Sequence, residues 1–190
     1  MTTPEQRARL RIDELLAAAG WSVQDVEQAD LHAARGVAIR EFELNAGFGT
    51  ADYLLYVDGG AAGVIEAKKE GATLAGVEIQ SAKYAQGLPA SLPAWRRPLV
   101  FLYESTGVET HFTNGLDPEP RARNVFAFHR PETLADALGD VAGRSGLQAA
   151  IPSGGSGAPA TISNGIGEPA PEYKAATFLS RVRAMPELAT

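Results

Sequence analysis

Two charged residues lie against a short apolar run, where charge is expensive to desolvate. The run Gly63-Val64-Ile65 has the character of a buried strand, and Glu66 and Lys68 follow it within three residues. Side chains alternate between the two faces of an extended chain, so Glu66 and Lys68 project to the same face, about 7 Å apart at the backbone. The pair is therefore a candidate for a chemical function.

A third residue joins this pair through a predicted hairpin. The run 51–57 reads as a strand, and the turn residues 58–60 connect it to the strand that carries Glu66. A position six or seven residues before the turn pairs with one six or seven after it, which brings Asp52 close to Glu66 and Lys68. The strand register and any bulge decide which face of the sheet Asp52 occupies.

The chemistry predicted for these three residues is phosphodiester hydrolysis. Two close carboxylates repel each other unless a positive charge lies between them, and Mg²⁺ suits one or two carboxylates. The metal would activate a bound water and neutralise a phosphoryl oxygen, while Lys68 would position or help to deprotonate that water. In most proteins a Glu-x-Lys triplet is solvated helix surface. Here the strand context and the hairpin position of Asp52 favour a metal site.

A helix predicted over 73–87 carries two more candidates. Gln80 and Tyr84 are four residues apart, so they lie on one helix face. They could contact a substrate beside the carboxylates. Alternatively, Tyr84 is a core aromatic residue with its hydroxyl at the surface, and Gln80 is ordinary helix surface.

Helices and strands that could position these residues are marked along the chain. Thr3, Pro4 and Gln6 have the pattern of a helix N-cap with a capping box. The other predicted elements are strands over 37–44, 51–57, 62–69, 97–105, 108–114 and 124–130, and helices over 73–87 and from Pro131 onward. Strands framed by helices predict an α/β domain with a mixed central sheet.

Composition sets the domain division and excludes several classes of protein. The 190 residues contain no Cys, which excludes disulfides and thiolate metal sites. A nuclease-like domain is predicted over 1–142, a Gly/Pro-rich flexible linker over 143–171 and a short terminal helix over 172–190. No signal peptide or membrane span is evident, so we expect a cytoplasmic protein. The net charge of −6 argues against DNA binding by general electrostatic attraction.

Several motifs in order resemble one known family. These are GFGTADYLLYVDGGAAGVIEAKKEG, VEIQSAKYAQGLP, PLVFLYESTGVETHFTNGLDPEPRAR and VFAFHRPETL, which together fall within about residues 3–140. They resemble the N-terminal nuclease domain of the restriction (R, HsdR) subunit of type I restriction–modification enzymes, in the PD-(D/E)xK nuclease superfamily.

The resemblance implies a restriction-endonuclease-like α/β core that cleaves double-stranded DNA with Mg²⁺. It assigns the catalytic motif to Asp52, Glu66 and Lys68, with the metal on the two carboxylates. It assigns DNA handling to the motif residues Gln80 and Tyr84. Glu41 or Glu43, on the preceding strand, could add a further acidic group, although neither matches a motif.

Subunits of this family continue into a helicase motor that uses ATP to translocate DNA. The sequence has no G-x-x-x-x-G-K-[ST] motif and ends where the motor should begin, so ATP is expected only through a motor absent from this chain. The implied partners are modification (methyltransferase) and specificity subunits. The alternatives are a truncated, non-catalytic assembly remnant of the subunit, or a free-standing nuclease in DNA processing.

Overall fold

A mixed sheet of seven strands, in the spatial order β1 to β7, forms the centre of the chain. The computed structural model describes residues 3–145, with side chains for residues 3–139. The elements are α1 (Pro4–Ala18), β1 (Ser22–Asp25), a short 3-10 helix η1 (Val26–Gln28), β2 (Gly36–Glu43), β3 (Thr50–Val57), β4 (Gly60–Ala67), α2 (Glu78–Gln86), β5 (Phe101–Ser105), β6 (Thr110–Asn114), β7 (Arg123–Val125) and α3 (Pro131–Ser145). The pairs β1–β2 and β4–β5 are parallel, and the other pairs are antiparallel.

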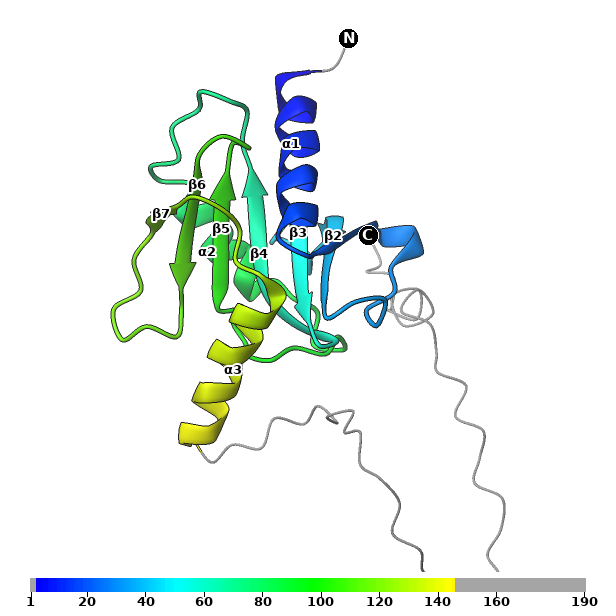
Figure 1. The fold of residues 1–190 in the computed structure, drawn as a ribbon, viewed down its shortest axis with the longest axis vertical. Coiled ribbons are helices and arrows are strands. Elements are labelled where there is room, and N and C mark those ends of the chain that lie inside the picture. Colours follow the sequence, from blue (N-terminus) through cyan, green and yellow to red (C-terminus); the bar gives the residue numbers. More distant parts are fainter. Residues whose placement is uncertain (1–2, 146–190) are drawn as a thin grey trace, which may run out of the picture.

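Helices cover both faces of this sheet (Figure 1). On one face, α1 and α3 contribute Ile12, Leu16, Leu134 and Leu138 to a buried cluster with the sheet. On the other face, α2 contributes Tyr84 to a second buried cluster. The central strands are therefore buried on both sides, which explains why β3 and β4 are almost continuously apolar. The predicted α/β class with a mixed sheet flanked by helices is confirmed.

The start of α1 follows its predicted cap. The Thr3 hydroxyl accepts the backbone N–H of Gln6 at 3.2 Å, and the Gln6 side chain accepts the N–H of Thr3 at 2.9 Å. This capping box satisfies two of the helix's otherwise unpaired backbone donors. It fixes the end of α1 that lies beside the candidate site.

The prediction of a helix over 73–87 is wrong at its start, because α2 begins at Glu78. Gly71 and Gly76 have φ of 77° and 86°, a left-handed conformation that does not continue an α-helix. The Thr73 hydroxyl accepts the N–H of Ala75 within that turn and does not cap α2. The predicted end at Gly87 is correct.

Two strand predictions were too long by several residues. Strand β5 begins at Phe101, since the chain before it is held in a loop where the Arg97 guanidinium donates to three carbonyls. Strand β7 ends at Val125, which pairs with the first residue of β6, so Phe126 has no position left to pair with. Phe126 is fully exposed instead, and Phe128 turns into the core.

One strand was not predicted at all. Strand β1 has only four residues, three of them polar, and contains a single Val. It pairs in parallel with β2 at the edge of the sheet. Such a short and polar edge strand has no alternating apolar pattern to reveal it.

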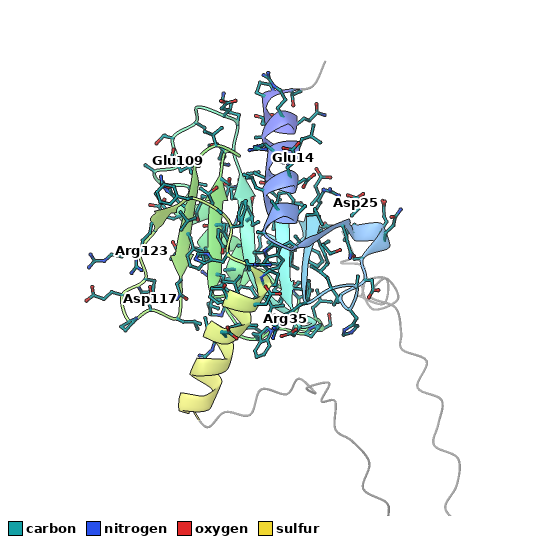
Figure 2. All side chains as sticks on the ribbon, in the orientation of Figure 1. Glu14, Asp25, Arg35, Glu109, Asp117 and Arg123 are labelled. Atoms are coloured by element: carbon teal, nitrogen blue, oxygen red, sulfur yellow. The ribbon has the colours of Figure 1, made fainter. Side chains whose placement is uncertain are left out.

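The periphery of the domain carries ion pairs between charged side chains. Asp117 and Arg123, labelled near the β6–β7 edge, are 3.3 Å apart, and Arg35 lies at the same distance from Asp58 (Figure 2). These exposed pairs are solvated and contribute little to stability.

The described residues end inside the predicted linker. Helix α3 runs to Ser145, so the first three residues of the predicted linker 143–171 are helical. The remainder of that linker and the helix predicted over 172–190 lie outside the described residues. The domain division as a whole stays a prediction. Within residues 3–145, no helix is long and apolar enough to cross a membrane.

Candidate active site

The site is built on the hairpin formed by β3 and β4. Asp58 and Gly59 form its turn with φ of 46° and 78°, the backbone of a tight type I′ connection. This confirms the predicted hairpin. Asp52 lies near the beginning of one strand, and Glu66 near the end of the other.

A β-bulge puts the two carboxylates on the same face of the sheet. Val57 pairs with Gly60, but Tyr53 pairs with Ile65, because the register shifts between Leu55 and Tyr56. An unshifted register would place Asp52 opposite Ile65, on the other face from Glu66. The extra residue in β4 therefore brings Asp52 opposite Glu66.

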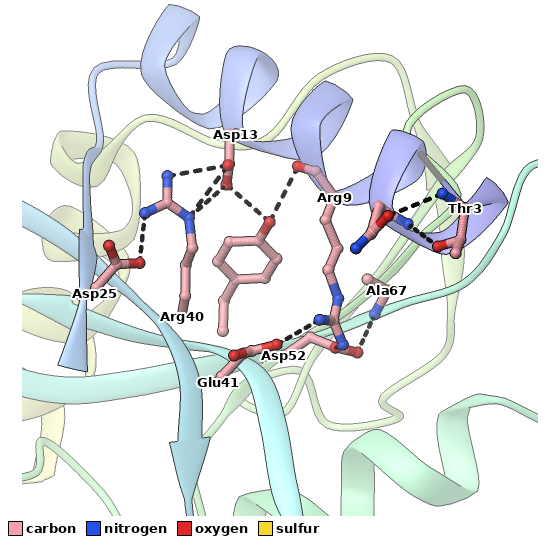
Figure 3. Close-up of polar contacts among 10 residues, drawn as sticks. Thr3, Arg9, Asp13, Asp25, Arg40, Glu41, Asp52 and Ala67 are labelled. Carbon is pink, nitrogen blue, oxygen red and sulfur yellow. Dashed lines mark hydrogen bonds and ion pairs between the residues drawn. The ribbon is translucent and has the colours of Figure 1, made fainter. Parts of the chain in front are cut away.

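Asp52 is held at both carboxylate oxygens. Its Oδ2 accepts the backbone N–H of Ala67 at 2.8 Å, which ties β3 to the end of β4. Its Oδ1 lies 2.5 Å from the guanidinium of Arg9, on α1 (Figure 3). The side chain of Asp52 is only 11% exposed.

Glu66 has one paired and one unpaired oxygen. Its Oε1 accepts the ammonium of Lys68 at 2.6 Å. Its Oε2 is buried and accepts no hydrogen bond from the described residues. A buried carboxylate oxygen without a donor is costly, so it marks a position where a cation or a proton would stabilise the group.

Lys68 connects the hairpin to α2. Its Nζ also donates to Oε1 of Gln80 at 3.0 Å, and Nε2 of Gln80 donates to the Tyr84 hydroxyl at 2.5 Å. An ammonium can only donate hydrogen bonds, so the amide oxygen of Gln80 faces Lys68 and its N–H₂ group is directed toward Tyr84. Four side chains thus form one connected chain, in the order Glu66, Lys68, Gln80 and Tyr84.

Burial dominates the electrostatics of the site. It raises the pKa of Glu66 to about 7, the hydrogen bond from Lys68 opposes this shift, and the nearby carboxylate of Asp52 adds to it. Burial also raises the pKa of Tyr84, so its phenol stays protonated at neutral pH. Glu66 consequently changes charge in the physiological pH range unless a cation is bound.

These groups open onto a cavity of about 500 Å³ between the end of the hairpin and the first turns of α1. Asp52, Glu66, Lys68 and Tyr84 line it. The lining also includes Thr3, Glu5, Gln6, Arg9, Thr50, Ala67, Lys69 and Ala72. The five motif residues Asp52, Glu66, Lys68, Gln80 and Tyr84 meet in one place, with Gln80 reaching the cavity through its two hydrogen-bond partners.

Arg9 belongs to the site but was not predicted. It is one of several charged residues on the exposed side of α1, and its spacing carries no motif. Only the tertiary packing of α1 against the hairpin places it at Asp52. Sequence reasoning therefore had no signal that could distinguish Arg9 from its neighbours.

The carboxylates are suitable donors for a hard divalent cation. Asp52 and Glu66 supply carboxylate oxygens, the unpaired Oε2 of Glu66 among them. Within residues 3–145 there is no group of three or more His, Cys, Asp or Glu residues placed to hold a metal. Glu41 pairs with Arg9 instead, and Glu43 is exposed and does not line the cavity. Any cation here would retain several waters, as Mg²⁺ commonly does.

The fold is a mixed α/β sheet flanked by helices, and the site gathers acidic and basic residues at the end of its central hairpin. Residues 22–97 match the family model of the second domain of the endonuclease subunit of the type I restriction enzyme EcoKI. This segment contains Asp52, Glu66, Lys68, Gln80 and Tyr84, and it excludes α1.

Among solved structures, the chain is similar to a fragment assigned as an HsdR subunit of a type I restriction enzyme from Vibrio vulnificus YJ016, with a TM-score of 0.54 and 20% identity. The similarity covers 77% of this chain but only 26% of that one. At this identity, the likeness concerns the fold. No curated protein matches the chain. The family match confirms the predicted resemblance to the endonuclease subunit of type I restriction enzymes over residues 22–97, and the structural match agrees with it in fold.

Proposed function

We propose that this chain carries the nuclease centre of a type I restriction endonuclease subunit and hydrolyses phosphodiester bonds of double-stranded DNA. One observation carries the proposal: Asp52, Glu66 and Lys68 converge at one cavity, where Oε2 of Glu66 is buried and has no donor among the described residues. The family match over residues 22–97 supports the same function.

In this proposal, Asp52 and Glu66 hold Mg²⁺. When bound, the ion would lower the pKa of a coordinated water and neutralise charge on a phosphate oxygen. The backbone N–H of Ala67 fixes one oxygen of Asp52, so that carboxylate is already oriented toward the cavity. Glu66 is fixed less firmly, by Lys68 alone among the described residues.

Lys68 serves the attacking water and the developing negative charge. Its ammonium is held between Glu66 and Gln80, at 2.6 and 3.0 Å, and it lines the cavity. A cation fixed in this way can donate a hydrogen bond to a phosphate oxygen without first having to reorganise. Loss of the Gln80 partner would leave Lys68 less precisely placed.

Gln80 and Tyr84 help to seat the DNA backbone. The Tyr84 oxygen accepts the Gln80 amide, and the phenol keeps its own proton for donation to an acceptor such as a phosphate oxygen. Tyr84 is 9% exposed and packs in the buried cluster on the α2 side of the sheet. It also lines the cavity, so it would both pack in the core and contact the DNA.

The rest of the restriction machinery would come from other segments or subunits. We propose that a helicase motor outside this chain hydrolyses ATP to translocate DNA, and that specificity and modification subunits recognise and methylate it. The complex would act in the cytoplasm. Since the chain spans 26% of the related HsdR fragment, these partners belong to the proposal for the whole enzyme.

Cleavage of supercoiled plasmid in Mg²⁺ and ATP, by the chain assembled with the proposed motor, specificity and modification subunits, tests the proposal. Lys68→Ala should reduce the rate at least ~100-fold, the contribution typical of acid–base and charge-stabilising groups. Lys83→Ala is the matched control, because Lys83 is exposed on α2 and does not line the cavity, and it should retain most of the activity. Equal cleavage by both variants would contradict the assignment, and metal-dependent cleavage without ATP would favour a free-standing nuclease.

A further inference from the structure

Arg9 contacts two carboxylates at once. Its Nη1 lies 2.5 Å from Oε1 of Glu41, and its Nη2 lies 2.5 Å from Oδ1 of Asp52 (Figure 3). Asp52 is one of the two proposed metal-holding residues, so a fixed positive charge lies beside the proposed metal position. Arg9 belongs to α1, which lies outside the family match over residues 22–97.

The contact with Asp52 competes with a bound cation. Oδ2 of Asp52 is occupied by the backbone N–H of Ala67, and Oδ1 is occupied by Arg9. A divalent ion on the same carboxylate would lie within a few ångströms of the guanidinium, where like charges repel strongly. The guanidinium stays protonated in proteins, so it cannot relieve the repulsion by losing its charge.

Glu41 provides an alternative partner for Arg9. Its backbone has a φ of 50°, a conformation that residues with side chains adopt uncommonly and that clusters at functional sites. Its carboxylate is 66% exposed and lies outside the cavity lining. Arg9 can therefore remain paired with Glu41 after it leaves Asp52.

Only the side chain of Arg9 would have to move. The Tyr53 hydroxyl donates to the carbonyl of Arg9, at 3.1 Å, and also contacts Asp13, at 2.8 Å. Asp13 in turn binds the guanidinium of Arg40 on β2 (Figure 3). These contacts fix the backbone of α1 against the sheet, whereas the Arg9 side chain is 42% exposed and has room to turn.

We propose that Arg9 is a positioning residue that neutralises Asp52 in the metal-free site and must turn to Glu41 alone before a divalent cation binds. The inference rests on the proposed function, because it assumes that Asp52 holds the metal. Arg9 would keep the two carboxylates from repelling each other before loading. It would also weaken metal binding relative to a site without this arginine.

Calorimetric titration of the 190-residue chain with Mg²⁺ tests the inference without any measurement of activity. Arg9→Gln should bind Mg²⁺ about tenfold more tightly, the change expected when a charged hydrogen bond no longer has to be broken. Glu41→Gln should bind it more weakly, because Arg9 loses its alternative partner and the site loses a negative charge. Arg11→Gln is the matched control on the same helix, since Arg11 pairs with Glu14 and does not line the cavity.

The opposite changes in Mg²⁺ affinity expected for Arg9→Gln and Glu41→Gln distinguish this role of Arg9 from a structural one. If Arg9 merely supported the fold, Arg9→Gln would bind Mg²⁺ no better than the wild type, and that result would overturn the inference. Arg9→Lys provides a second variant if the glutamine protein does not fold, and it should tighten binding by a smaller factor. Asp52→Asn distinguishes the proposed metal site from the proposed role of Arg9. If Asp52→Asn leaves the Mg²⁺ affinity unchanged, the metal site itself is contradicted. If Asp52→Asn loses the affinity but Arg9→Gln binds Mg²⁺ as the wild type does, only the role of Arg9 is overturned.

Discussion

At the scale of single residues, Glu66 is the most informative group. It is 3% exposed, one of its oxygens binds Lys68 and the other has no donor among the described residues. The sequence predicted that Glu66 and Lys68 project to one face, and the direct contact agrees with this. It did not predict how deeply Glu66 is buried, because burial depends on α2 packing over the end of the hairpin.

Because the pKa of Glu66 is raised, the stability of the folded protein should fall as the pH rises toward 7. The folded protein holds a proton on Glu66 up to pH about 7, whereas an unfolded chain releases it near the ordinary value of 4.5. The stabilisation from this group is therefore complete below pH ~4.5 and is lost as the pH rises through about 7, by at most ~1.4 kcal/mol per pH unit.

Urea unfolding of the wild type and Glu66→Gln, in a chelator at pH 5 and pH 8, measures this effect. The amide cannot ionise, so the glutamine variant should gain stability relative to the wild type as the pH rises. A stability difference that is the same at both pH values would contradict the burial argument for Glu66.

At the scale of elements, the β3–β4 hairpin and its bulge create the site. The turn residues predicted the hairpin and placed Asp52 near Glu66, but nothing in the run Ala61-Ala62-Gly63 shows which of these small residues is extra. Strand register depends on packing against β2 and β5 on either side, which single-strand patterns do not contain. The start of α2 was misplaced for another reason: the predicted helix began at Thr73, but Gly71 and Gly76 have positive φ and do not continue an α-helix.

Strands β4 and β5 approach so closely at Gly63 that a side chain there should destabilise the sheet. A Cβ added at Gly63 would lie 2.3 Å from the carbonyl oxygen of Phe101 on β5, so the two strands would have to separate. Gly63→Ala should cost about 2 kcal/mol of unfolding free energy, as overpacking in a core commonly does.

The control for that change is Gly139→Ala on α3. A Cβ at Gly139 meets no atom of the described residues within 4 Å, so the helix should gain roughly 0.5–1 kcal/mol. Urea denaturation of both variants measures the two changes, which should have opposite signs. Equal effects of the two substitutions would mean that the β4–β5 contact does not constrain the sheet.

At the scale of the whole molecule, net charge affects how the proposed DNA substrate would bind. Its net charge of −6 opposes general attraction to DNA, so contact between the site and the phosphate backbone of the proposed substrate would depend on the few cations at the cavity, such as Lys68 and Lys69. The chain also spans 26% of the related HsdR fragment, and the proposed motor and specificity subunits would deliver DNA to the site. The overall fold class could be predicted from strand and helix patterns, whereas the contribution of α1 to the site could not.

In the proposed function Asp52 and Glu66 together hold a divalent cation, and a crystal structure of the chain soaked in Mn²⁺ would reveal that ion. We predict an anomalous scattering peak about 2.1 Å from an oxygen of each carboxylate, with Oε2 of Glu66 as one ligand. Arg9 should then contact Glu41 and no longer Asp52. A crystal at millimolar Mn²⁺ and neutral pH that shows no peak between these carboxylates would contradict the account.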